Sequence, residues 1–117
     1  MKFEIYTYNP HIYDLCDQVQ LVETYDNIQE VRECIEYEAQ ILTEEYDYTM
    51  VHCDNMKKHI PSNTKIDLGN WVRNLPIHTG ESTWFLYDFP NIDELVPHET
   101  YMLMESCDSN MWVMVLP

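Results

Sequence analysis

The chain has 117 residues, of which 21 are Asp or Glu and only 6 are Lys or Arg, so its net charge at neutral pH is −15. Hydrophobic residues make up 45% and aromatic residues 13%, which allows one packed domain over residues 1–117 and is unlike a disordered acidic tail. A negative charge of this size disfavours electrostatic binding to nucleic acid or to an anionic membrane.

The first half of the chain has the patterns of two strands followed by one helix. Residues 2–8 alternate apolar and polar side chains and end at the turn signal Asn9-Pro10, and residues 19–24 form a second expected strand. Asp26, followed three residues later by Gln29, indicates a helix start of the capping-box type, so a helix is expected over about 27–43. The apolar residues that recur at steps of three and four share one helix face: Ile28, Val31, Ile35, Ala39 and Leu42.

The second half is rich in strand patterns. Strands are expected over 46–53 and 83–89, and a hairpin over 101–105 and 111–116 with a polar loop between its strands. A short helix is expected over 67–75 and a single helical turn over 91–96. This order predicts an α+β fold, in which one main amphipathic helix packs on one face of an antiparallel β-sheet of about five or six strands.

The charges are segregated along the chain rather than mixed. From Phe3 to Met56 there are 13 acids and one base, Arg32. The segment 57–80 carries four bases, and the remainder, from Glu81 to Pro117, carries seven acids and no base. The basic segment has two open interpretations: it counters neighbouring acids, or it is a second contact site. Segregation of this kind is unlike a surface tuned only for solubility.

The helix face opposite the apolar residues is acidic. At about 100° per residue, Glu30, Glu33 and Tyr37 point away from the apolar side, as do Gln40 and Glu44. Such a face is either a solvated one or a binding surface. Carboxylates at the C-terminal end of a helix oppose the macrodipole at a cost of about 0.3 to 1 kcal/mol each, which favours the second interpretation. The candidate partner-binding residues are therefore Glu30, Glu33, Tyr37, Glu44, Glu45 and Asp47.

Motifs for catalysis, cofactors and metals are weak. The chain has no P-loop, GxGxxG, GxSxG or HExxH pattern, and its two glycines cannot form a glycine-rich phosphate cradle, so we expect neither an enzyme nor a cofactor. The best metal candidates are His52, Cys53 and His59, but adjacent strand residues point to opposite faces, so no metal site is expected. Irregular cysteine spacing and the lack of a signal-peptide pattern or a long apolar run predict a reduced, cytoplasmic protein.

In size, acidity and lack of catalytic motifs, the chain resembles small phage- or plasmid-encoded inhibitors that imitate nucleic acid: anti-CRISPR proteins, antirestriction proteins and uracil-DNA glycosylase inhibitors. The resemblance concerns this profile and transfers no residue role. It implies a non-catalytic inhibitor that occupies the basic nucleic-acid-binding cleft of a host enzyme, such as a CRISPR effector or a restriction enzyme, in the host cytoplasm if phage-encoded.

Two alternatives stay open. One is a small enzyme or metal-binding protein. The other is a structural or adaptor module that forms a homodimer through an aromatic- and methionine-rich sheet. The residues of that sheet belong either to such an interface or to the core, and they are Trp84, Met102, Met104, Met111, Trp112 and Met114.

Overall fold

The computed structural model describes residues 1–54, 58–59, 71, 82–88, 91–106 and 109–117. Its elements in chain order are β1 (Lys2–Tyr8), the 3-10 turn η1 (Leu15–Asp17), β2 (Val19–Tyr25), α1 (Ile28–Glu44), β3 (Thr49–Cys53), β4 (Lys58–His59), β5 (Thr83–Tyr87), the 3-10 turn η2 (Ile92–Glu94), β6 (Thr100–Glu105) and β7 (Asn110–Leu116). The helix expected over 67–75 and the basic segment 57–80 lie almost wholly outside the described residues.

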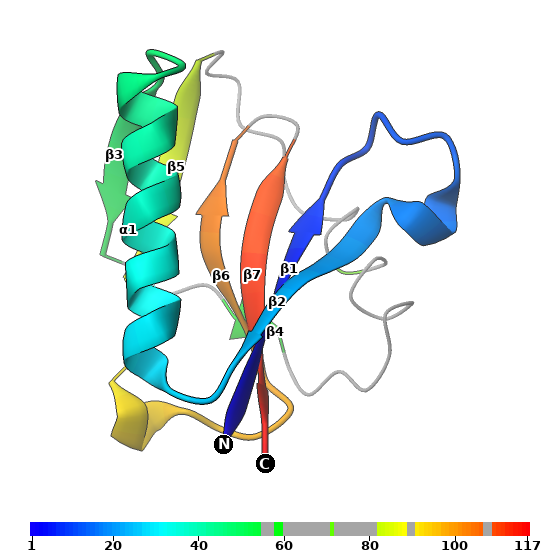
Figure 1. The fold of residues 1–117 in the computed structure, drawn as a ribbon, viewed down its shortest axis with the longest axis vertical. Helices are drawn as coiled ribbons and strands as arrows, with labels where there is room; N and C mark the ends of the chain where they lie inside the picture. The colour runs from blue at the N-terminus through cyan, green and yellow to red at the C-terminus, as the bar shows by residue number, and fades with distance from the viewer. Residues whose placement is uncertain (55–57, 60–70, 72–81, 89–90, 107–108) are drawn as a thin grey trace.

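Six strands form one sheet in the order β2-β1-β7-β6-β5-β3, and the short β4 pairs with β6. The helix α1 lies in front of one face of this sheet (Figure 1). The predicted α+β class, with a mostly antiparallel sheet and one main helix, is confirmed. One pair departs from the antiparallel pattern: β3 runs parallel to β5, with Thr49 opposite Thr83 and Cys53 opposite Tyr87. A parallel pair needs a long crossover, and here residues 54–82 make that connection.

The strand expected over 46–53 begins three residues late. Tyr48 N–H donates to the carbonyl of Leu42 at 3.0 Å, so the chain after α1 first closes the end of the helix. Asp47 has φ of 60°, in the left-handed region, which Asp adopts more readily than most residues. The turn chemistry of the helix end therefore overrides the strand propensity of Tyr46 and Tyr48.

The sheet carries a hydrophobic core on each face. The core under α1 joins Val31 and Ile35 of the helix to strand residues such as Phe3, Ile5 and Val113. On the other face, Trp112 is fully buried and stacks on Tyr6 with ring centroids 6.0 Å apart, and Trp71 meets it edge-on at 6.2 Å. Met102 and Met114 are buried in this second core, and Met104 and Met111 are buried in the core under α1. The aromatic and methionine side chains considered for self-association therefore belong to the core, apart from the half-buried Trp84.

Among the described residues, one carboxylate lies inside the protein. Glu105, at the end of β6, is 2% exposed and accepts a hydrogen bond from the Tyr87 hydroxyl on the neighbouring strand β5. Burial is the main cause that raises the pKa of Tyr87, and the bond to Glu105 adds to it. Tyr87 therefore stays protonated and remains a donor to this buried carboxylate, which would be costly to bury without hydrogen bonds.

The cap of α1 lies one residue later than the Asp26 that the sequence predicted. It is Asn27, whose Oδ1 accepts a hydrogen bond from the Glu30 N–H at 3.0 Å. We expect Asn27→Ala to lower the free energy of unfolding by about 1 kcal/mol, because it removes the acceptor of an otherwise unpaired helix N–H. Urea unfolding followed by circular dichroism measures this loss. Asn27→Asp, which keeps an acceptor, is the matched control, and its free energy of unfolding should fall much less. An equal loss in both variants would contradict the capping role.

Besides Tyr87, three more tyrosines link stability to alkaline pH. Burial, which is the first cause in each case, raises the pKa of Tyr6, Tyr25 and Tyr101 from 10.0 to about 12. In the unfolded chain these hydroxyls ionise near pH 10, whereas in the folded protein they stay protonated up to about pH 12. The stabilisation that this difference provides is fully present below about pH 10 and is lost as the pH rises to about 12. We expect the urea midpoint to fall as the pH rises from about 10 to about 12. Replacing these tyrosines with Phe should make the urea midpoint depend less on pH in this range. An unchanged dependence on pH would contradict the prediction.

Candidate protein-interaction surface

The outward face of α1 presents the side chains that the sequence predicted. The helix turns Val31 and Ile35 into the core, because these apolar residues recur at steps of three and four. On the opposite side Glu30, Glu33 and Glu44 are exposed, and Tyr37 is 62% exposed. This places four of the six candidate residues on one surface.

The turn after α1 carries two further exposed carboxylates. Glu45 is the C-cap residue, and Asp47 follows two residues later; both are exposed. Between them Tyr46 is 63% exposed and stacks against Tyr48 with ring centroids 6.3 Å apart. We call the surface formed by Glu30, Glu33, Tyr37, Glu44, Glu45 and Asp47 the α1 acidic face.

The α1 acidic face is not neutralised within the described part of the chain. Its five carboxylates have no cationic partner there, and the side chain of Glu44 accepts a hydrogen bond only from the neutral Gln40, at 3.1 Å. Arg32, the one base of α1, lies on the flank of the helix, and its Nε atom is buried with no hydrogen-bond partner among the described residues. Within the described residues, the α1 acidic face is therefore a cluster of carboxylates without a countercharge.

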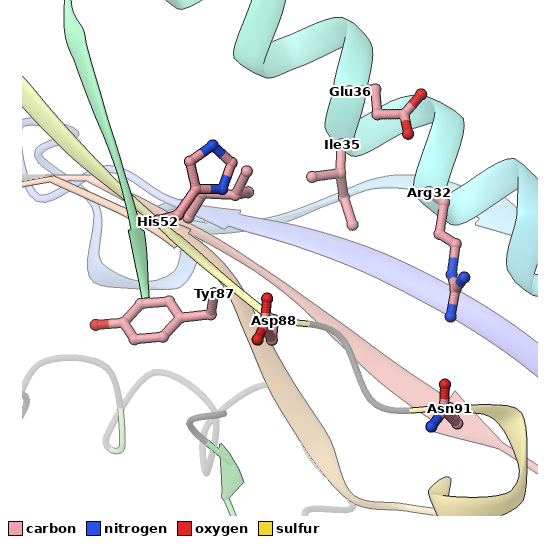
Figure 2. A pocket seen from close by; sticks show the side chains of 8 residues that line it. Arg32, Ile35, Glu36, His52, Tyr87, Asp88 and Asn91 are labelled. Carbon is pink, nitrogen blue, oxygen red and sulfur yellow. The ribbon is translucent and has the colours of Figure 1, made fainter. Parts of the chain in front are cut away.

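Arg32 borders a hollow of about 350 Å³ between α1 and the ends of β3 and β5. Figure 2 shows that its side chain extends from the helix toward Asn91, while His52 and Asp88 come from the strand side. Ile35 and Leu86 supply the apolar part of the lining. Sequence reasoning did not single out this hollow. Its only sequence signal is a lone arginine in an otherwise acidic helix.

The register of β3 and β5 places the candidate metal ligands apart. His52 is opposite Leu86, which packs in the core under α1, whereas Cys53 is opposite Tyr87, which packs in the core of the other face. Adjacent strand residues thus point to opposite faces. The side chain of His59 lies outside the described atoms. No group of three or more His, Cys, Asp or Glu side chains in the described residues is arranged to hold a metal ion.

The junction of β2 and α1 was not anticipated from the sequence. Tyr25 and Cys34 share a hydrogen bond there, and burial raises the pKa of the Cys34 thiol. The charges of Glu23 and Glu30 add to the raised pKa of Tyr25, and those of Glu38 and Glu23 add to the raised pKa of Cys34. Negative charge therefore extends from α1 onto β2.

Comparison of the chain with protein-family models, with curated proteins and with solved structures gives no match. Within the described residues, no helix has the length and apolar character needed to cross a membrane.

Proposed function

We propose that the protein is a non-catalytic inhibitor that occupies the basic nucleic-acid-binding cleft of a host enzyme. The observation that supports the proposal is the α1 acidic face, where five exposed carboxylates lie along one helix and its following turn without a cationic partner among the described residues. Carboxylates three or four residues apart lie about 5 to 6 Å from each other at Cβ, which is comparable to the spacing of successive phosphates.

The arrangement costs the protein stability, which favours a role for it. Glu44 and Glu45 lie where the negative end of the helix dipole repels them, by about 0.3 to 1 kcal/mol each. Selection for helix stability alone would place Lys or Arg at this end. Tyr37 and Tyr46 add exposed rings, whose faces attract Arg and Lys side chains. Acid and tyrosine together suit a cleft lined with arginine and lysine.

A competition assay tests the proposal. A labelled duplex is bound to purified candidate enzymes, namely CRISPR effector and restriction enzymes, and the protein is titrated in at low and at high salt. We expect displacement of the duplex that weakens as salt screens the charges. Polyglutamate at an equal concentration of charge is the control, and it should displace the duplex less well because it lacks the fixed spacing. Displacement that is independent of salt would contradict the proposal.

A further inference from the structure

β2 forms an open edge of the described sheet. In the described part of the chain β2 is the terminal strand of the sheet, paired on one side with β1 and with no strand on the other. Five consecutive residues from Gln20 to Thr24 are exposed, and Leu21 and Val22 are 50% and 52% exposed. An edge of this kind presents unpaired N–H and C=O groups to any extended chain.

β2 has few of the features that protect edge strands. Its sequence contains no Lys and no Pro, the residues that most often block pairing at an edge. A bulge lies at Val22, because Ile5 pairs with Glu23 whereas the next residue, Tyr6, pairs with Leu21. A bulge increases the local twist, so an incoming strand must follow that twist. A short extended segment can do so more easily than a second preformed sheet edge.

The two faces of β2 have different chemistry. Glu23 pairs with Ile5, whose side chain lies under α1, so Glu23 is on the helix side of the sheet. The charge of Glu23 also helps to raise the pKa of Tyr25 at the end of the strand, after burial and the bond to Cys34. Leu21 pairs with Tyr6 and is on the other side. A strand added beside β2 would therefore meet the carboxylate of Glu23 on one face and the apolar side chain of Leu21 on the other.

We propose that the edge of β2 binds an extended segment of a partner protein in which basic and apolar residues alternate. Strand alternation places the basic side chains on the side of Glu23 and the apolar ones on the side of Leu21. The occupant is not a second copy of this chain, because two copies would bring together two bulged edges, each belonging to a protein with a net charge of −15. The inference takes from the proposed function only that the partner is basic, and it adds a backbone-pairing site.

The probe is a capped peptide of alternating lysine and valine, about eight residues long to span β2. We expect hydrogen exchange of the outward-pointing β2 amides, measured by NMR, to slow by about 10-fold or more at saturating peptide, since pairing protects them. A peptide of alternating glutamate and valine, and one with lysines and valines in separate blocks, should not protect β2. Equal protection by either control, or protection only at β3, would overturn the proposal.

Leu21→Lys should weaken binding of the peptide by about 10-fold, because it opposes the lysines and removes the apolar contact. Val51→Lys is the matched control on the opposite edge strand, β3, where Val51 is 38% exposed, and should bind as the unaltered protein does. Unchanged binding by Leu21→Lys would contradict the site. A dimer in sedimentation that Leu21→Lys dissolves would show that a second copy, not a basic segment, is the occupant.

The variant Glu33→Lys/Glu44→Lys separates this inference from the proposed function. It alters the α1 acidic face but leaves Glu23, Glu30 and Glu38 in place. We expect it to lose competition with duplex on a basic enzyme and to keep β2 protection by the peptide. Loss of peptide protection in this variant would show that the peptide recognises general charge, which would overturn the backbone-pairing site. If the unaltered protein does not displace duplex from any basic enzyme but the peptide still protects β2, the proposed function is wrong and the β2 site stands.

Discussion

Replacing Glu30, Glu33 and Glu44 with lysine is expected to weaken binding to a basic nucleic-acid-binding enzyme by about 100-fold at moderate salt, since electrostatic steering alone changes association rates by about 10- to 1,000-fold. The fold should survive, because all three side chains are exposed. Glu30→Lys is unfavourable in the first turn of α1, but Glu44→Lys is favourable in the last, so the dipole effects of these two changes largely cancel. Competition with a labelled duplex, together with urea unfolding, measures both expectations.

A matched variant separates the position of the charges from their number. Three changes from −1 to +1 alter the net charge from −15 to −9. Replacing Asp17, Asp54 and Asp93 with lysine produces the same total, and these exposed acids lie outside the α1 acidic face. We expect the matched variant to bind the basic enzyme less than about 10-fold more weakly than the unaltered protein, through weaker long-range steering. Equal losses in the two variants would mean that overall charge, and not the α1 acidic face, governs binding.

Trp112→Ala should have the largest effect on stability of any single substitution in the described sheet, a loss of about 3 to 5 kcal/mol. The indole is fully buried and lies between Tyr6 and Trp71, so its removal leaves a cavity lined by rings that cannot collapse into it. A small domain is stable by only about 5 to 15 kcal/mol, so this variant should unfold at much lower urea concentration.

Two comparisons make the Trp112 result interpretable. Trp112→Phe keeps an aromatic ring and should lose less stability than Trp112→Ala. It also removes the indole Nε1, which is buried with no hydrogen-bond partner among the described residues. Tyr37→Ala removes an exposed ring from α1 and should change the free energy of unfolding by no more than about 0.5 kcal/mol. A loss below about 1 kcal/mol for Trp112→Ala would show that the second face of the sheet contributes little to stability.

The sequence predicted the local features of the fold well, because they depend on period and capping. The helix, the outward direction of Glu33 and Tyr37, and the C-terminal hairpin follow from spacings of three, four and two. The parallel pairing of β3 with β5 was not predictable in this way, since nothing in the pattern of either strand states which neighbour it joins. Periodicity describes the faces of an element, and pairing depends on the packing of the whole sheet.

The candidate surface was predictable only in part, for the same reason. The α1 acidic face lies on one helix, so its residues are related by a fixed rotation. The hollow beside Arg32 draws on α1, β3, β5 and the residue Asn91, and the carboxylates near Tyr25 come from both β2 and α1. Such assemblies of distant segments depend on strand order, which no local pattern reports. The open edge of β2 is likewise a property of the complete sheet.

The position of β1 has a consequence for how the protein is made. β1 lies between β2 and β7, and Lys2 is paired with Leu116, so the first strand of the chain finishes its pairing only with the last (Figure 1). During synthesis on the ribosome, Phe3 and Ile5 therefore stay incompletely covered until β7 emerges. Contacts between such distant segments form slowly, so these apolar side chains are exposed to aggregation until β7 pairs with β1.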